Sequence, residues 1–476
     1  MPDKANSYLD VHPEQDEVTG TCFSCILTPP DSFIKPVKFL LDCGLYQETM
    51  YTERNKDFSF EPNEYEFVLV THGHIDHIGR LPLLYQKGFR GKVYCTRLTA
   101  EVIAIALKNT LKIFENELKL YKIPPLYTQE DVDMVLENIV TFKVNKLFYV
   151  HKYIAVSFIA NAHIFGATSV FLKITYPRQE SMTYLFTGDY AKQNRLFEVP
   201  DVPKFVTENH LTIFQEATYG STHLEDIEKV FVDNLKEAIA KNKTIVIPLF
   251  AFGRFQEVMY LITQLLQEKV IPRSYRISLD GKLAKEYVEL FRKYRSCLKK
   301  EVQSIFSTKF RWVDDPDDRE LIISDYKKRI ILASGGMGSF GPIVEYERRL
   351  LDKPDVLFHY MGYTAVDSLG TKILNAKNLE AVCIRGNTVY KQADVKISRE
   401  SSSHAKVEEL IEYLYSIKKL DCITLYHGQK EIVQQYQQTL KNLKISKDVL
   451  ISNSNVTHRY GPYGYIKSIY HTTTPV

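Results

Sequence analysis

The seven residues 71–77 contain four side chains of the types that commonly bind metal ions. They read Thr-His-Gly-His-Ile-Asp-His, so the candidate ligands are His72, His74, Asp76 and His77. Neutral imidazoles and ionised carboxylates without a cysteine suit zinc, and they also suit manganese. The alternating spacing lets His72 and His74 point to one ion while Asp76 and His77 face a second. A histidine-rich surface loop is the alternative, but such a dense set of ligand-type side chains is costly to hold together without a cation.

The element that must position this segment is a strand directly before it. The apolar run Phe-Val-Leu-Val at residues 67–70 predicts a buried strand. In α/β folds the chemistry usually takes place on loops at the carboxyl ends of strands. Residues 71–77 are therefore predicted to form such a loop, in a place where an active site is expected.

Length and composition indicate an ordinary globular protein with more than one domain. The chain has 476 residues, of which 45% are hydrophobic and 25% charged, and two domains are the natural expectation. The net charge of +3 is not that of a strongly basic nucleic-acid-binding protein, so RNA would have to be held by a local basic track. No apolar run approaches the roughly 18–20 residues of a membrane span, and the N-terminus lacks the features of a signal peptide. We therefore expect a cytoplasmic protein that does not bind membranes.

The cysteines do not indicate a disulfide framework or a zinc site. Seven cysteines in a chain of this length suggest free thiols. Cys22 and Cys25 form a C-x-x-C pair, but no second pair completes a metal site. Positions i and i+3 of a strand face opposite sides, so we expect both thiols to be packing residues.

The pattern of the sequence changes after residue 218, where strand-like runs alternate with helical stretches. Residues 245–250 and 330–334 are apolar runs that predict buried strands, and each leads through glycines into a helical pattern. Thr222 and Glu225 have the spacing of a capping box, which predicts that a helix begins there. This repetition predicts a second α/β domain built on a parallel sheet.

Further segments place the chain near a known group of enzymes. The pattern H-x-H-x-D-H is the signature of the metallo-β-lactamase superfamily. Segments that resemble the other motifs of this superfamily and of its β-CASP nucleases follow in the expected order: Leu-Leu-Asp-Cys-Gly-Leu at 40–45, Ala-His-Ile-Phe-Gly-Ala at 162–167, Phe-Thr-Gly-Asp-Tyr at 186–190, Gln-Glu-Ala-Thr-Tyr-Gly at 215–220, Ser-His-Ala at 403–405 and Leu-Tyr-His-Gly at 425–428. The chain is thereby similar to the β-CASP nucleases, the group that includes ribonuclease J and the endonuclease subunit that cuts pre-mRNA 3′ ends.

The resemblance implies an α/β fold in which a metallo-β-lactamase αββα sandwich carries an inserted β-CASP α/β domain. The motif residues stand on both sides of the second α/β region, so that region must be inserted into the first domain. The expected domains are residues 1–217 for the first part of the metallo-β-lactamase domain, 218–398 for the β-CASP domain and 399–476 for the completion of the first domain. In the last of these, residues 405–418 predict a helix and residues 421–426 a strand.

The resemblance also implies two zinc ions, with manganese as the alternative. The expected ligands are His72, His74 and His163 for one ion, Asp76, His77 and His427 for the other, and Asp189 as a bridge between them. Asp42 is expected to support the metal-binding loop without touching a metal. Taken alone, Asp189 could be a turn residue and His163 a core histidine, but the joint order of the motifs favours ligands.

The same resemblance gives roles to residues beside the metals. Asp76 is counted among the catalytic residues as part of the signature. The departing oxygen needs a proton, and Glu216 and His404 suit that task because a carboxylate can orient and charge an imidazole. We assign His404 as general acid or phosphate-binding residue and Glu216 as its partner. The hydroxyls of Ser401 and Ser403 are candidates for binding a substrate phosphate, and serines of a polar turn are the alternative.

The sequence therefore predicts a metal-dependent hydrolase, a ribonuclease of RNA processing with a two-zinc active site between its two domains. Exonuclease and endonuclease action both remain open, and degradation from a 5′-monophosphate end is expected if the serines bind that phosphate. The alternatives are a DNA substrate, a small ester or thioester, and a non-catalytic RNA-processing subunit. The second domain argues against a small substrate, and the intact ligand set argues against a non-catalytic subunit. RNA is the expected partner, and the sequence allows a homodimer.

Overall fold

The protein divides into two compact units. A computed structural model describes residues 7–16, 18–226, 230–362, 364, 367–398 and 403–471. Unit 1 takes in residues up to 194, residues 199–224 and residues from 403 onward, and unit 2 takes in residues 195–198 and 225–402. Unit 1 is therefore built from segments that precede and follow most of unit 2 in the chain.

Unit 1 contains two β-sheets. The strands of the first follow the order β23-β22-β1-β2-β3-β4-β5-β6, and those of the second follow the order β21-β20-β11-β10-β9-β8-β7. The first sheet consists of β1 Tyr8–Pro13, β2 Phe23–Thr28, β3 Val37–Leu41, β4 Phe67–Leu69, β5 Lys92–Thr96, β6 Ile139–Phe142, β22 Val456–Gly461 and β23 Gly464–Tyr470. The second consists of β7 Phe148–His151, β8 Ile154–Ala160, β9 Thr168–Ile174, β10 Met182–Phe186, β11 His210–Glu216, β20 Lys419–Tyr426 and β21 Asp448–Ile451.

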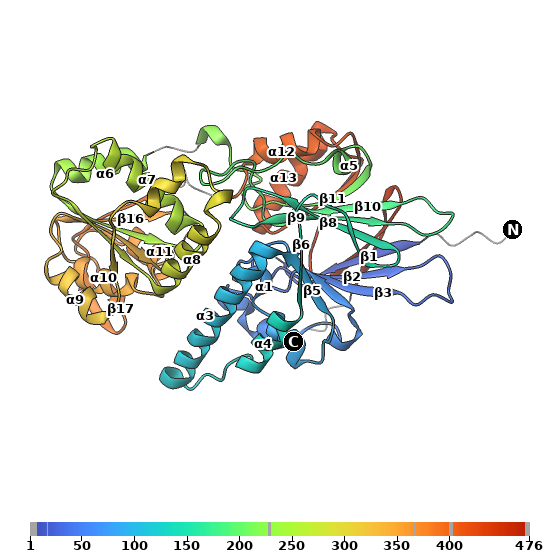
Figure 1. The fold of residues 1–476 in the computed structure, drawn as a ribbon, viewed down its shortest axis with the longest axis horizontal. Coiled ribbons are helices and arrows are strands. Elements are labelled where there is room, and N and C mark those ends of the chain that lie inside the picture. Colours follow the sequence, from blue (N-terminus) through green and yellow to red (C-terminus); the bar gives the residue numbers. More distant parts are fainter. Residues whose placement is uncertain are drawn as a thin grey trace. The chain divides into compact units, whose positions relative to one another are not determined.

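Helices cover the outer face of each sheet in unit 1 (Figure 1). The first sheet carries α1 Ile75–Ile78, α2 Leu81–Gln86, α3 Arg97–Tyr121 and α4 Gln129–Glu137, and the second carries α5 Lys204–Thr207, α12 Val407–Tyr415 and α13 Lys430–Leu443. The inner faces of the two sheets form an apolar core that includes Phe23, Phe158 and Phe186. Every residue of β10 is buried, because both faces of its sheet are covered. The predicted αββα sandwich is confirmed.

Unit 2 is built on a parallel sheet with the strand order β14-β13-β15-β12-β16-β19. Its strands are β12 Thr244–Leu249, β13 Arg276–Asp280, β14 Arg311–Val313, β15 Arg329–Ser334, β16 Val356–Met361 and β19 Asp394–Ser398. One face is covered by α6 Phe231–Ala240, α7 Arg254–Gln267 and α8 Lys282–Lys293, and the other by α9 Pro316–Ser324, α10 Ile343–Leu350, α11 Leu369–Asn375 and the hairpin of β17 Ala381–Ile384 and β18 Asn387–Tyr390. The α/β fold predicted for this region is confirmed.

Short 3-10 helices connect several of these elements. They are η1 Thr49–Lys56, η2 Pro62–Glu64, η3 Leu224–Asp226, η4 Arg295–Cys297 and η5 Glu301–Phe306. Among the residues with described coordinates, no helix is both long enough and apolar enough to cross a bilayer.

One helix start differs from the sequence prediction. The strands predicted at 245–250 and 330–334 form as β12 and β15, but the helix predicted to begin at Thr222 is wrong. Residues Leu224–Asp226 form η3 instead, and α6 begins at Phe231. The carboxylate of Glu408 accepts hydrogen bonds from the ring of His223 and from the main-chain N–H of Leu224, at 2.5 and 3.1 Å. This contact joins residues 223 and 224 to α12 within unit 1.

The C-x-x-C pair lies where the strand pattern predicts. Cys22 packs in the core between the first sheet and its helices, whereas Cys25 packs in the core between the two sheets. Both are fully buried free thiols, which confirms that they are packing residues.

Candidate metal centre

The predicted ligands stand at the ends of strands that run in the same direction. β10, β11 and β20 are parallel neighbours, and β8 shares their direction because the antiparallel strand β9 separates it from β10. The residues that follow or end these strands are His163 after β8, Asp189 after β10, Glu216 at the end of β11 and His427 after β20. The loop after β4 and helix α1 bring residues 72–77 to the same place. The fold therefore gathers groups that are far apart in the chain, such as His77 and His427, which are 350 positions apart.

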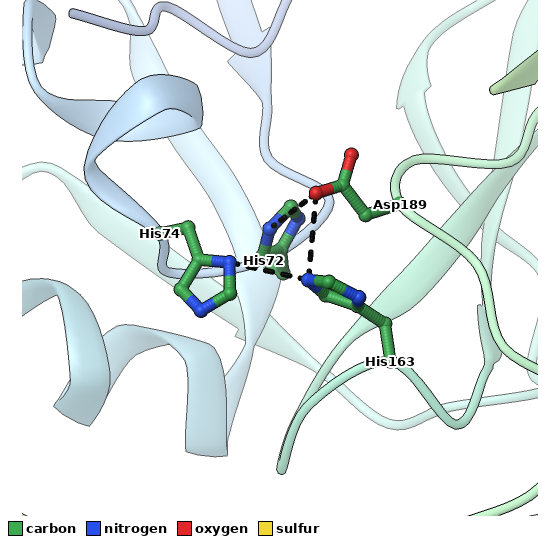
Figure 2. A group of neighbouring side chains, drawn as sticks. All are labelled: His72, His74, His163 and Asp189. Atoms are coloured by element: carbon green, nitrogen blue, oxygen red, sulfur yellow. Dashed lines mark hydrogen bonds and ion pairs between the residues drawn. The ribbon is translucent and has the colours of Figure 1, made fainter. Parts of the chain in front are cut away.

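Four side chains form the first group of candidate ligands, which Figure 2 shows turned toward one another. They are His72, His74, His163 and Asp189, with ligand atoms within 4.8 Å of one another. The Nε2 atom of His163 lies 3.1 Å from Nδ1 of His74 and 3.4 Å from Oδ2 of Asp189. The Nε2 atom of His72 lies 3.6 Å from that oxygen. The loop after β4 supplies two of the imidazoles, and the second sheet supplies the third and the carboxylate.

A second group lies on the other side of Asp189. It consists of Asp76, His77, Asp189 and His427, again with ligand atoms within 4.8 Å of one another. The Nε2 atom of His427 lies 3.4 Å from Nε2 of His77 and 3.7 Å from Oδ2 of Asp76. The Oδ1 atom of Asp189 lies 3.1 Å from Nε2 of His77 and 3.3 Å from Nε2 of His427. Asp189 thus turns one oxygen to each group, as a carboxylate that bridges two ions would.

Two of the histidines donate from Nδ1 to an oxygen acceptor on the side away from the ligand cluster. The Nδ1 atom of His77 donates to Oδ2 of Asp42 at 2.8 Å, and Nδ1 of His163 donates to the main-chain oxygen of Ser403 at 2.8 Å. In the neutral form of each ring, a proton on Nδ1 leaves the lone pair on Nε2, the atom that faces the ligand cluster.

Two threonine hydroxyls orient two more histidines in the same way. Thr71 Oγ1 donates to Asp42 and therefore accepts from Nδ1 of His72, 3.0 Å away. Thr218 Oγ1 donates to the main-chain oxygen of His427 and accepts from Nδ1 of the same residue, also at 3.0 Å. The sequence analysis missed both threonines. The available clue to their roles was their position in the sequence. Thr71 directly precedes His72, and Thr218 lies two residues after Glu216.

The cluster contains buried polar atoms that a cation would satisfy. Nε2 of His72 and Oδ1 of Asp189 have no hydrogen-bond partner, and a buried polar atom without one is destabilising. Ligand atoms placed about 2.0–2.1 Å from one tetrahedral zinc ion would lie about 3.3–3.4 Å from one another. The distances in the first group, 3.1 to 3.6 Å, are close to that spacing. The residues of both groups therefore fit divalent cations.

Burial and charge set the protonation of the first group. Burial lowers the pKa of His72 and His163 well below the ordinary value, and it lowers the pKa of His74 to about 4. For Asp189, burial raises the pKa, but the surrounding histidines, His427 foremost, hold it well below its usual range. Neutral imidazoles and an ionised carboxylate are the forms that bind a metal.

The second group includes a histidine that holds its proton more firmly. Burial lowers the pKa of His77, but the carboxylates of Asp189 and Asp42 raise it well above its ordinary value. Binding of a cation to Nε2 of His77 would therefore release a proton.

Asp42 makes hydrogen bonds to the loop that carries the candidate ligands. It follows β3, and β3 pairs with β4 in parallel, so its carboxylate reaches the residue after β4. Its Oδ1 accepts the N–H of Thr71 at 2.8 Å, and its Oδ2 accepts the hydroxyl of Thr71 at 2.7 Å as well as Nδ1 of His77. The residue adopts a left-handed conformation with φ 58°, which costs energy outside glycine and is common at functional sites.

Two glycines allow the backbone of the site to pack closely. A Cβ atom at Gly44 would lie 1.6 Å from the main-chain oxygen of Asp76, and one at Gly188 would lie 2.8 Å from Cβ of Thr71. Gly188 also has φ 58°, which favours glycine. The loops that carry Asp76 and Asp189 could not approach their neighbours with a larger residue at either place.

Glu216 and His404 form a pair beside the metal ligands. Nδ1 of His404 lies 2.9 Å from Oε1 of Glu216, and its Nε2 lies 3.8 Å from Oδ2 of Asp189. Glu216 is fully buried, and it also accepts the N–H of Tyr190 at 3.0 Å and the N–H of Thr218 at 2.9 Å. Burial raises the pKa of Glu216, but His404 reverses this and leaves the pKa below its usual value. The pair therefore has the arrangement of an imidazole oriented by an ionised carboxylate.

The two serines predicted to bind substrate are only partly within the described structure. Ser401 lies outside the described residues. Ser403 contacts the site through its main-chain oxygen, which accepts from His163. The role of the two hydroxyls stays a prediction.

Comparisons with known proteins match both units. Residues 38–144 match the family model of the metallo-β-lactamase superfamily, and residues 255–373 match that of the Beta-Casp domain. The transcription termination factor FttA of Methanosarcina mazei is 29% identical over 463 residues, covering 92% of this chain and 70% of that protein. Ribonuclease TTHA0252 of Thermus thermophilus is 27% identical over 406 residues, covering 83% of this chain and 88% of that protein. An RNase J-like protein of Methanocaldococcus jannaschii is 26% identical over 422 residues, covering 86% and 91%.

Proposed function

We propose that this chain belongs to the metallo-β-lactamase/Beta-Casp family and that it is a metal-dependent ribonuclease that hydrolyses RNA phosphodiester bonds. The observation that carries the proposal is Asp189, whose two oxygens face two separate groups of candidate ligands. Relatives whose names identify them as ribonucleases support RNA as the substrate. We propose zinc as the metal, with manganese as the alternative, because imidazole and carboxylate ligands suit both.

The proposed chemistry divides between the bound ions and the chain's own residues. A pair of divalent cations supplies Lewis acidity, which activates a water molecule and offsets charge on a phosphate. Asp76, His77 and Asp189 would hold the cations beside the phosphate as ligands. Asp42 would hold the loop that carries the ligands. Glu216 engages Nδ1 of His404, so Nε2 of His404 is the atom that faces the cluster. Protonated His404 would deliver a proton from Nε2 to the departing oxygen, with Glu216 stabilising the imidazolium.

Other expectations from the sequence stay predictions. They include the domain boundaries at 217/218 and 398/399, the opening of the site onto a seam between the domains, a cytoplasmic location and a homodimer. Binding of a 5′-terminal phosphate by Ser401 and Ser403 is a further proposal. It predicts that S403A weakens the preference for 5′-monophosphate RNA without lowering metal content, since the main-chain oxygen that His163 uses is retained.

The test is an assay of purified protein with RNA and DNA of the same sequence. Each strand is end-labelled and carries a 5′-hydroxyl, a 5′-monophosphate or a 5′-triphosphate. We expect cleavage of RNA that stops on chelation and returns with zinc or manganese. Cleavage of DNA but not of RNA would show that DNA, and not RNA, is the substrate. Hydrolysis of only a small ester or thioester would exclude a nuclease. Full RNA cleavage in a metal-free preparation would overturn the mechanism.

A further inference from the structure

A buried lysine stands two residues after His404. The side chain of Lys406 belongs to a residue that is only 5% exposed, and its ammonium donates to the main-chain oxygen of His404 at 2.8 Å. The same ammonium lies 4.0 Å from the centroid of the Tyr219 ring, close enough for a cation–π interaction. The rings of Tyr219 and His404 are 6.0 Å apart. Lys406 therefore contacts both the main chain of His404 and an aromatic ring beside its imidazole.

This position is an unfavourable one for a lysine. Lys406 is the N-cap of α12, where serine, threonine, aspartate and asparagine are strongly preferred. A cation at a helix N-terminus is opposed by the helix dipole, and lysine is almost never buried without a compensating interaction. The Lys406 side chain makes no capping hydrogen bond, so the helix start lacks the stabilisation that a preferred N-cap residue would give. Residues that break local rules in this way are often retained for function.

Residues 403–406 are held in place by main-chain hydrogen bonds, one of which is to a candidate ligand. Ser403 accepts from Nδ1 of His163, and the N–H of Ala405 donates to the main-chain oxygen of Tyr190 at 2.7 Å. The N–H of Lys406 donates to Glu409, at 3.0 Å. The carbonyl of His404 accepts a hydrogen bond from the ammonium of Lys406. The Lys406 bond and the Ala405 bond hold the two ends of one peptide group, and together they fix the main chain that carries the His404 side chain.

We propose that Lys406 is a positioning residue for His404, which it holds with Nδ1 on Glu216 and Nε2 toward the metal ligands. The inference rests on the proposed role of His404 as the proton donor. The ammonium acts through the main-chain oxygen and the Tyr219 ring, so Lys406 itself touches neither substrate nor metal. Misplacement of a catalytic group by about 1 Å can lower a rate on the order of 10²-fold, which is the scale of effect expected here.

The test compares K406M and K406R with the full-length wild type on an end-labelled RNA. Methionine keeps the length and apolar stem of lysine but removes the charge, whereas arginine keeps a cation and donors. K406M is expected to lower kcat about 10- to 100-fold with KM unchanged. Metal content and Tm are expected to stay at the wild-type values or, for Tm, to rise. K406R is expected to restore most of kcat.

A matched control is available in unit 2. The ammonium of Lys391 also donates to main-chain oxygens, of Ile373 at 2.9 Å and Ala376 at 2.6 Å, and the residue lies outside the segments that supply the candidate ligands. K391M should keep the wild-type kcat. A K406M loss that tracks a lower metal content or Tm, or an equal loss in K391M, would overturn the inference.

A double-mutant cycle separates this inference from the proposed function. If Lys406 acts through His404, then K406M should lower kcat no further in the H404A background. Losses that multiply would show that the two residues act independently and would overturn the inference. If H404A loses activity while K406M does not, only the role of Lys406 fails. If H404A keeps the full kcat, the proton-donor role in the proposed function fails first, and the positioning role falls with it.

Discussion

The Nδ1 atom of His404 lies 2.9 Å from Oε1 of Glu216, and this contact joins the last residue of β11 to the turn before α12. Both oxygens of the carboxylate are used, because Oε1 also accepts the N–H of Tyr190 and Oε2 accepts the N–H of Thr218. The side chain of residue 216 must therefore present two acceptor oxygens. A carboxylate meets that demand and an amide does not.

The first prediction follows from this pair. H404A and E216Q should each lower kcat on the order of 10²–10⁴-fold, the range for loss of general acid–base catalysis. Both should keep the wild-type metal content, because neither residue belongs to the two groups that share Asp189; the two form a third group of possible ligands with His427, which the metal analysis tests. Steady-state kinetics with elemental analysis on the same preparations is the measurement. If H404A loses one equivalent of metal, His404 is a ligand and the assignment is wrong.

The second prediction concerns the stoichiometry of the metals. Wild type should bind about two ions per chain. H74A removes a ligand of the first group only and should lose mainly one ion, whereas D189A removes the shared carboxylate and should lose both. Both variants should be inactive on RNA. Equal metal loss in the two variants would argue against Asp189 as a bridge.

The third prediction concerns the support behind the loop. D42N replaces a carboxylate that accepts from Thr71 twice and from His77 once with a side chain that has a single acceptor oxygen. Loss of such a partner typically lowers metal affinity about 10- to 100-fold. Competition with a fluorescent chelator would measure it. An unchanged affinity would mean that Asp42 only packs the loop.

The fourth prediction concerns stability and pH in unit 2. Burial raises the pKa of Glu347 to about 8, against a lowering by the hydroxyl of Tyr360, which donates to Oε1 at 2.6 Å. The unfolded chain has an ordinary carboxyl pKa of 4.5, so between about pH 4.5 and 8 the folded state binds more protons. Stability of unit 2 should therefore fall as pH rises through this window, by at most a few kcal/mol, and level off above it.

The variant E347Q should remove most of that pH dependence, because a neutral amide still accepts from Tyr360. The single tryptophan of the chain, Trp312, lies in β14 of unit 2 and reports its unfolding by fluorescence. Urea denaturation of wild type and E347Q at pH 5 and pH 8 is the measurement. Parallel changes in the two proteins would assign the pH dependence to other groups.

The sequence predicts some parts of the site better than others for a physical reason. Residues 72–77 stand together because a single loop carries them, and their types and spacing indicate a metal without any knowledge of the fold. His163, Asp189 and His427 come from separate strand ends, and only the resemblance to a family with ordered motifs connects them. The structure brings all of these residues together, whereas their binding of metal stays a prediction.

What the sequence analysis missed depends on tertiary contacts. Thr71 and Thr218 have ordinary residue types, and their roles appear only when Asp42 and His427 are seen beside them. The helix expected at Thr222 fails for a similar reason, because Glu408 from a distant helix binds Leu224. The strands at 245–250 and 330–334 were predictable because continuous apolar runs leave few alternatives, whereas the layer order of unit 1 was expected from the family resemblance.

The origin of the ligands on both sides of unit 2 has a consequence for biosynthesis. His77 and His427 are 350 positions apart in the chain, and the ring nitrogens that face the second ion are theirs. At a translation rate of roughly 5–20 residues per second, the ribosome adds His427 about 18–70 s after His77. A growing chain therefore lacks one of the candidate ligands until residue 427 has been translated. If the chain is the proposed nuclease, fragments that stop before His427 should therefore lack its activity.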